Sequence, residues 1–206
     1  MSGFSRRGAC PSLSAPMQTG DGLLARLSPA DGELSAAQLA GVARAAQRYG
    51  NGLLEITARG NLQVRGVTRA NVEALGEDIA ALGIKVRTGV TVETGPLAGL
   101  DALERADPRP LAEAVREGAR PLAGSLAPKV SVIVDGGGAL PLGGVLADVR
   151  LAATGDGWRV ATGGDERTAR RLGVFDADGA VAAALALLAV FTAGDRRIAV
   201  IFVGAA

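Results

Sequence analysis

Short apolar runs and two amphipathic segments alternate along the first half of the chain. Four runs have the length and composition of β-strands and lie at residues 23–27, 52–57, 61–66 and 85–92. The first amphipathic segment follows Ser35, whose spacing to Gln38 forms a capping box, and continues to Tyr49. The second follows Thr68, a candidate N-cap, and ends at Gly83. The pattern therefore predicts two helices among four strands.

The order strand, helix, strand, strand, helix, strand predicts a ferredoxin-like βαββαβ unit over residues 21–92. A parallel doubly wound sheet fits this order less well, because no helix separates the two middle strands. Residues 1–20 are rich in serine, glycine and proline and lack a hydrophobic period, so we expect an extended N-terminal arm before this unit.

The second half also mixes strand and helix patterns. Its apolar runs predict strands at 130–135, 145–152, 158–162 and 198–203, with a further short segment at 167–172. Helical patterns lie at residues 110–118 and after Asp178, a candidate N-cap, and the residues 154–157 are typical of a hairpin turn. We expect a connector with one helix at 93–127 and a second α+β domain at 128–206, so the fold class is α+β throughout.

Three consecutive glycines follow the predicted strand that ends at Asp135. A phosphate-binding loop requires either Gly-Lys-Ser/Thr or a helix directly after the glycines, and neither pattern is present. We therefore expect residues 136–138 to form a turn between antiparallel strands. Asp135 and Asp148 are acidic candidates near this turn, but a metal site needs several converging oxygen atoms, and we predict no metal site.

Composition and charge argue against several classes of function. The chain has no histidine, which excludes histidine general bases and imidazole metal sites. Its single cysteine, Cys10, can form neither an intrachain disulfide nor a four-cysteine cluster. A net charge of +1 without a basic stripe argues against nucleic-acid binding. The apolar stretch 180–193 is too short to span a bilayer, no secretory signal follows Arg6 and Arg7, and we expect a cytoplasmic protein.

The densest group of hydrogen-bond donors lies in the segment TARGNLQVRG at 57–66. Two extended pieces joined by a tight turn would bring four polar side chains together: Thr57, Arg59, Gln63 and Arg65. Such a set suits an anionic ligand. A hairpin with a solvated polar face is the alternative interpretation.

Several segments, in the same order and spacing, resemble the nitrite and sulfite reductase family. The stretch at 57–66 is similar to the signature of its ferredoxin-like half-domains. Four further segments are similar to the precorrin-3B synthase branch: RRGACP at 6–11, PMQTGDGLL at 16–24, PLAG at 96–99 and PKVSVIVDGGG at 128–138. The resemblance covers nearly the whole chain.

The resemblance implies two pseudo-symmetric halves in the complete enzyme, each with a ferredoxin-like unit and an α+β unit, around a tetrapyrrole site. It also implies that the cysteine ligands of a 4Fe-4S cluster lie in the second half. This chain resembles the first half, so residues 128–206 correspond to a first α+β repeat without cluster cysteines. We expect no cofactor to be held by this chain alone, whereas the complete protein is expected to hold the cluster and an iron or tetrapyrrole group.

Five residues resemble family positions around the tetrapyrrole: Arg26, Arg59, Gln63, Arg87 and Lys129. Arginine binds a carboxylate with two parallel donors and stays charged, which suits the acetate and propionate groups of a precorrin. Ser131 stands where the family has a second lysine, so the sulfite-binding group of cations is incomplete. For each arginine a solvated surface position is the alternative, and Lys129 is also compatible with an edge-strand role. No catalytic residue is assigned.

The resemblance implies that the chain is the N-terminal half of a precorrin-3B synthase-like oxidoreductase of aerobic cobalamin biosynthesis. This half would shape the tetrapyrrole site and be redox-inactive alone. Its expected partners are the tetrapyrrole and either the C-terminal half or a second copy of the chain. The alternatives are a non-catalytic half-length protein that binds a tetrapyrrole or another polyanion, and a fragment of a sulfite or nitrite reductase. Cys10 is expected to be structural or incidental.

Overall fold

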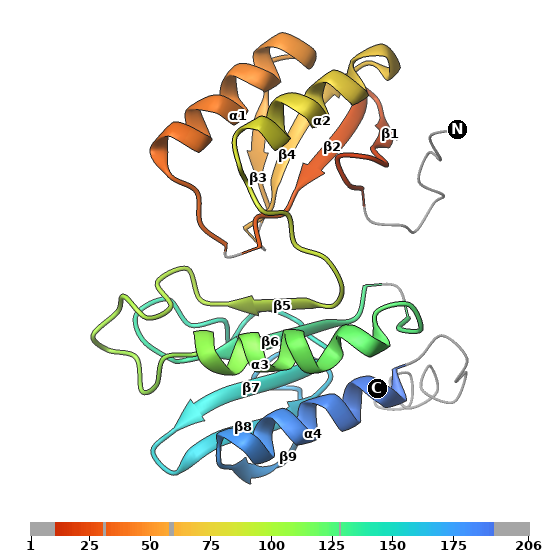
Figure 1. Cartoon of the computed structure of the whole chain (residues 1–206). Coiled ribbons are helices and arrows are strands. Elements are labelled where there is room, and N and C mark those ends of the chain that lie inside the picture. The colour runs from red at the N-terminus through yellow and green to blue at the C-terminus, as the bar shows by residue number, and fades with distance from the viewer. Residues whose placement is uncertain (1–10, 31, 58–59, 128, 192–206) are drawn as a thin grey trace. The chain divides into compact units, whose positions relative to one another are not determined.

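The structure is a computed structural model and describes residues 11–30, 32–57, 60–127 and 129–191. The chain divides into two compact units, Met1–Thr88 and Gly89–Ala206 (Figure 1). Each unit contains one β-sheet with two α-helices packed on one of its faces.

The first unit has a four-stranded antiparallel sheet in the order β1-β2-β4-β3. Its strands are Met17–Thr19 (β1), Gly22–Leu27 (β2), Leu54–Ile56 (β3) and Leu62–Val67 (β4). A 3-10 turn, Arg69–Asn71 (η1), precedes the second of the two helices, which are Ala36–Tyr49 (α1) and Val72–Ala81 (α2). Apolar side chains between sheet and helices form the core, among them Leu27, Val42, Val64, Leu75 and Ile79.

Local sequence determines where the helices of this unit begin and end. Ser35 Oγ accepts from the Gln38 backbone N–H at 3.2 Å, and Gln38 Oε1 accepts from the Ser35 N–H at 2.9 Å, so the predicted capping box is confirmed. The predicted Thr68 cap is wrong: Thr68 makes no capping hydrogen bond, because the chain first forms the η1 turn. Gly83 follows α2 with a φ of 67°, which favours glycine, and closes it as predicted.

The fourth strand of the predicted βαββαβ unit is replaced by two short pieces. Arg87 N–H donates to Ser28 O at 2.8 Å. An isolated antiparallel bridge joins Pro29 to Val86, so this segment pairs only with residues directly after β2. The other end of β2 pairs with β1, which comes from the expected arm. The prediction of one strand over 85–92 is therefore wrong, because residues 85–87 pair only with residues 28–30 and residues 91–92 belong to β5 of the second unit.

The second unit has a five-stranded mixed sheet in the order β5-β6-β7-β8-β9. Its strands are Thr91–Thr94 (β5), Ser131–Asp135 (β6), Val149–Thr154 (β7), Gly157–Thr162 (β8) and Arg170–Phe175 (β9). Its helices are Arg109–Ala119 (α3), the 3-10 turn Arg120–Leu122 (η2) and Ala177–Val190 (α4). The core includes Val92, Val115, Val132, Leu151 and Leu188.

The helix expected inside a connector is a structural part of this second unit. β5 runs parallel to β6, with Val92 opposite Val132, and α3 lies between these two strands in sequence. A parallel pair needs a crossover connection, and α3 packs its buried side chains Leu111 and Val115 into the shared core. The division of the chain between Thr88 and Gly89 accordingly differs from the expected boundaries at residues 92 and 127.

The glycine segment does not connect antiparallel strands, because β6 and β7 are parallel. Residues 136–148 instead form a long return loop to the start of β7. Asp135 accepts hydrogen bonds from the backbone N–H groups of Gly137 at 2.9 Å and Leu142 at 2.8 Å. Arg150 is 5% exposed and donates to the Leu142 carbonyl at 3.0 Å, and its burial lowers its pKa. These two side chains hold the loop in place.

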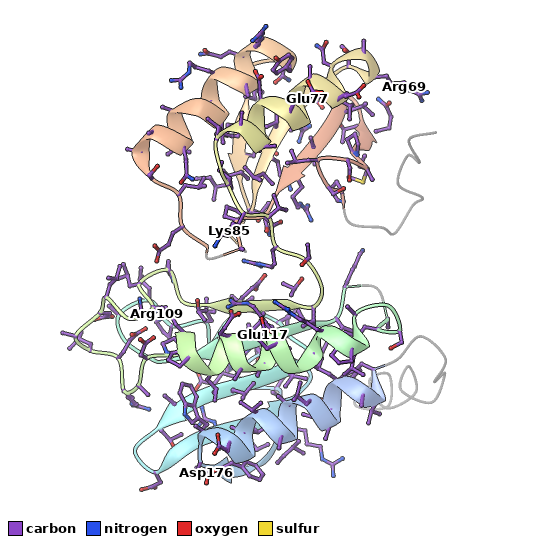
Figure 2. The ribbon with its side chains drawn as sticks, viewed as in Figure 1. Arg69, Glu77, Lys85, Arg109, Glu117 and Asp176 are labelled. Atoms are coloured by element: carbon purple, nitrogen blue, oxygen red, sulfur yellow. The ribbon has the colours of Figure 1, made fainter. Side chains whose placement is uncertain are left out.

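Other elements of the second unit lie close to their predicted positions. The hairpin at 154–157 joins β7 and β8 as predicted. Asp176, labelled in Figure 2, caps α4 instead of Asp178. Its carboxylate accepts from the Gly179 N–H at 2.8 Å. The predicted strand at 198–203 lies outside the described residues. Over the part of the chain that the structure describes, no helix combines the length and hydropathy needed to cross a bilayer.

The packing of α2 generates a stability prediction. Leu75→Ala leaves a cavity in the first core and is expected to lower the free energy of unfolding of that unit by about 2–5 kcal/mol. Leu39→Ala is the matched control on α1, because Leu39 is 44% exposed, and should change it by about 0.5 kcal/mol or less.

Urea denaturation measures both variants. The single tyrosine, Tyr49, lies in the first unit and the single tryptophan, Trp158, in the second, so their spectroscopic signals report the two units separately. Equal losses for the two variants in the Tyr49 signal would contradict the assignment of Leu75 to the core.

Candidate functional site

Alternation along the strands gives the first sheet one apolar and one polar face. Leu23, Ala25 and Leu27 of β2 point into the core beneath α1 and α2. Arg26 lies between two of these residues in an extended strand and therefore points to the opposite face. In β4 the core residues Leu62 and Val64 likewise send the side chain between them to that face.

Register across three strands aligns three polar residues on this face, which we call the polar row: Arg26, Gln63 and Glu55. Gln63 of β4 lies opposite Arg26 of β2 and also opposite Glu55 of β3. The two ends of the Gln63 amide lie 2.8 Å from Arg26 Nη2 and 3.1 Å from Glu55 Oε2. We assign the oxygen to the Arg26 side, so that Arg26 Nη2 donates to Oε1 and Nε2 donates to Glu55 Oε2. The amide of Gln63 takes the orientation that an arginine on one side and a carboxylate on the other require.

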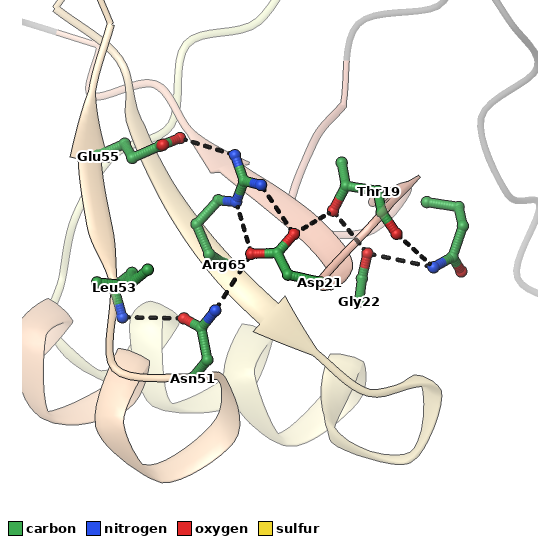
Figure 3. A network of polar contacts seen from close by, with 8 residues as sticks. Thr19, Asp21, Gly22, Asn51, Leu53, Glu55 and Arg65 are labelled. Carbon is green, nitrogen blue, oxygen red and sulfur yellow. Dashed lines mark hydrogen bonds and ion pairs between the residues drawn. The ribbon is translucent and has the colours of Figure 1, made fainter.

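A second arginine on the same face is used internally (Figure 3). Arg65 binds Asp21 in a two-pronged pair, with Nη2 to Oδ1 at 2.8 Å and Nε to Oδ2 at 3.1 Å. Its Nη1 donates to Glu55 Oε2 at 3.1 Å. Asp21 also accepts from Thr19 Oγ1 at 2.8 Å and from Asn51 Nδ2 at 3.2 Å. The network therefore continues from the polar row to the turn between β1 and β2.

These contacts change the proton affinity of both members of the pair. Hydrogen bonds from Arg65, and then from Thr19, hold the pKa of Asp21 well below its usual range. Hydrogen bonds to Asp21 and Glu55 raise the pKa of Arg65. Arg65, expected as one of four ligand donors, is thus neutralised by two carboxylates. The sequence pattern does not indicate either partner, because Asp21 lies 44 residues from Arg65 and Glu55 lies outside the donor-rich segment 57–66.

Two residues of the predicted hairpin donor set remain to be placed, Thr57 and Arg59. Thr57 Oγ1 accepts from Asn61 N–H at 3.1 Å, so Thr57 holds the turn of the hairpin. Arg59 lies outside the described residues. Arg26 contacts Gln63, and no carboxylate among the described residues forms an ion pair with Arg26. Among the described residues of the predicted set, Arg26 is therefore the cation that the polar row presents.

Two of the other predicted site residues come from segments outside the three strands of the polar row. Arg87 follows α2, and its backbone pairs just beyond the end of β2 at which Arg26 lies. Lys129 belongs to the second unit, where it is exposed and precedes β6 with a φ of 71°. Nearby Ser131 donates to Asp148 Oδ2 through its backbone N–H at 2.8 Å, so Asp148 supports the start of β6. The ligand contacts of these residues stay a prediction.

The chain does not match the donor set of the iron-sulfur cluster that its resemblance implies. Such clusters are bound chiefly by several cysteine thiolates, and the sequence contains one cysteine and no histidine. In the described part of the chain, no group of three or more acidic, cysteine or histidine side chains could hold a metal ion.

Comparison with known proteins defines the class of fold. Residues 15–82 match the family described as nitrite/sulfite reductase ferredoxin-like half domain. The structure resembles Mycobacterium tuberculosis NirA with a TM-score of 0.65 and 22% identity, over 82% of this chain and 34% of NirA. It also resembles dissimilatory sulfite reductase I with a TM-score of 0.50 and 15% identity, over 63% of this chain and 32% of that protein. The fold is that of nitrite and sulfite reductases.

Sequence comparison is more specific. The chain is 46% identical over 189 residues to precorrin-3B synthase of a Sinorhizobium species, covering 89% of this chain and 41% of the relative. It is 36% identical over 100 residues to ferredoxin–nitrite reductase of Synechococcus elongatus, covering 46% of this chain and 20% of that protein. Over most of its own length the chain is thus similar in sequence to precorrin-3B synthase, and it spans less than half the length of these relatives.

The paired Asp21 carboxylate generates a pH prediction. Because the folded state depresses its pKa, Asp21 adds stability above the ordinary aspartate pKa of about 3.9, and this contribution is lost as the pH falls through the folded value. The urea midpoint of the Tyr49 signal should therefore fall between neutral pH and about pH 2. Asp21→Asn should flatten part of this dependence.

The exposed Glu33 provides the control for this experiment, since Glu33→Gln removes a carboxylate of the same unit without touching the Arg65 network. The wild-type pH dependence should persist in Glu33→Gln. An unchanged profile in Asp21→Asn would show that the Arg65–Asp21 pair does not stabilise the fold.

Proposed function

We propose that this chain is the N-terminal part of a precorrin-3B synthase-like oxidoreductase of aerobic cobalamin biosynthesis, and that the polar face of its first unit forms part of a tetrapyrrole site. In this proposal the remaining part of the enzyme, or a second copy of this chain, completes the site and holds the redox cluster. The partner ligand is a precorrin with several carboxylates, and the setting is the cytoplasm.

One observation supports this proposal above all others: 46% identity to a precorrin-3B synthase extends over 189 residues. That length exceeds either compact unit, so the similarity includes both sheets rather than one widespread half-domain. The match to a nitrite reductase is lower in identity and covers about half as many residues, which makes a reductase fragment the weaker alternative.

The chemistry of the polar row agrees with a carboxylate ligand. Arg26 uses Nη2 to contact Gln63, and its guanidinium has further N–H groups that can form two parallel bonds to a carboxylate. Arg65 is neutralised by Asp21 and Glu55, so it does not compete for the same anion. In the proposed complex, Arg26 orients one acetate or propionate group of the macrocycle.

A binding protein without its own redox chemistry is the second candidate. A single cysteine favours it, because this chain alone cannot provide the thiolates of a 4Fe-4S cluster. Both candidates share the ligand and differ in what completes the site. Coexpression with the C-terminal part of a homologous precorrin-3B synthase would distinguish them, since only the enzyme reading predicts a stable complex that hydroxylates its precorrin substrate.

The proposed site predicts the effect of removing Arg26. Uroporphyrin, a fluorescent tetrapyrrole with acetate and propionate groups, is titrated into the purified chain at fixed ionic strength. Arg26→Ala should weaken binding about tenfold or more, because a hydrogen bond to a charged group contributes about 1.5–3 kcal/mol. The measurement is the quenching or shift of porphyrin emission.

Arg44→Ala is the matched control. Arg44 is exposed on α1, which covers the opposite face of the sheet, and its removal changes the net charge by the same amount. Its affinity should stay within about twofold of the wild type. Equal losses in both variants would indicate general electrostatic attraction and would rule out the proposed site.

A further inference from the structure

We infer that Glu55 is a positioning residue for Arg26 and acts through the amide of Gln63. The inference deepens the proposed function, because the importance of Arg26 for a ligand rests on that proposal. The geometry of the polar row is independent of the proposed function. Its three members lie opposite one another on adjacent strands, so each can influence the next through one hydrogen bond.

The side-chain amide of Gln63 can adopt two orientations. A glutamine side chain presents an oxygen acceptor on one side and an NH₂ donor on the other, and rotation exchanges them. Gln63 is only 8% exposed, so water cannot easily satisfy the wrong orientation. Glu55 accepts from Nε2 at 3.1 Å and thereby directs Oε1 toward Arg26, which donates to it at 2.8 Å.

The Glu55 side chain is itself held in place by a further hydrogen bond. It lies on the edge strand β3, and its side chain is 50% exposed. The same Oε2 atom that receives Gln63 also receives Arg65 Nη1 at 3.1 Å. Arg65 is in turn held by Asp21 through two hydrogen bonds. The Glu55 carboxylate is therefore held by both Gln63 and Arg65.

The arrangement changes the role inferred for Gln63. Both polar ends of its amide are engaged within the protein, one with Arg26 and one with Glu55. Gln63 thus holds Arg26 in one orientation instead of contacting the ligand. Reversal of the amide would direct NH₂ at the guanidinium, place two donors against each other and displace Arg26 from its position.

The sign of the effect separates positioning from simple electrostatics. Removing a negative charge beside an anion site should strengthen anion binding by charge alone. Positioning predicts the opposite for Glu55→Ala, because the amide loses the acceptor that orients it. Glu55→Gln keeps an acceptor oxygen for both Gln63 and Arg65, and the exposure of residue 55 lets its NH₂ group face solvent.

The first test needs no ligand. The side-chain amide of Gln63 is followed by ¹⁵N–¹H NMR and assigned through its disappearance in Gln63→Leu. Glu55→Ala should shift this NH₂ signal and remove its protection from solvent exchange, whereas Glu55→Gln and the remote control Glu33→Ala should retain protection. An unchanged Gln63 signal in Glu55→Ala would overturn the inference whatever the chain binds.

The second test is a double-mutant cycle with uroporphyrin as the probe. Glu55→Ala should weaken binding about fivefold in the wild-type background and have no further effect in Arg26→Ala, as expected for residues of one network. Glu55→Gln should restore near wild-type affinity. Tighter binding by Glu55→Ala, or an equal loss in the Arg26→Ala background, would refute positioning. Failure of the wild type to bind uroporphyrin would count against the proposed function and leave the NMR test to decide the inference.

Discussion

Antiparallel register in the first sheet decides which side chains of this protein can act together. Residues opposite each other on neighbouring strands are close enough for direct contact, and a shift by one position would move each side chain to the other face. Here the register aligns Arg26, Gln63 and Glu55 across β2, β4 and β3. The core on the opposite face fixes that register, because Ala25, Leu27 and the apolar residues of β4 must remain beneath the helices.

Arginine has two distinct uses in this chain, which explains why its abundance alone carries little functional information. Arg65 and Arg150 serve the fold: one pairs with carboxylates on the first sheet, and the other is buried beneath the return loop of the second. Both arginines donate their hydrogen bonds to groups within the protein. Arg26 differs because its described partner is a neutral amide, which retains the positive charge of the guanidinium for an external anion.

Features that depend on neighbouring residues could be predicted from the sequence, and features that depend on distant pairing could not. The capping box at Ser35 and the hairpin at 154–157 are local, and both form as predicted. The pairing of β5 with β6 joins segments far apart in the chain, and no local pattern indicates which sheet such a strand enters. The same limit applies to Arg65, whose partner Asp21 lies 44 residues away.

The charge balance of the first unit limits what it can do alone. A precorrin carries several carboxylates, and one arginine held by a neutral amide can neutralise only one of them. Arg65, the other described arginine of the polar face, is already paired with Asp21 and Glu55. A tetrapyrrole site of the kind proposed would therefore need cations from outside the described polar row. In the proposed enzyme, the ferredoxin-like unit would be a rigid support that orients one carboxylate through Arg26, while other segments would bind the rest.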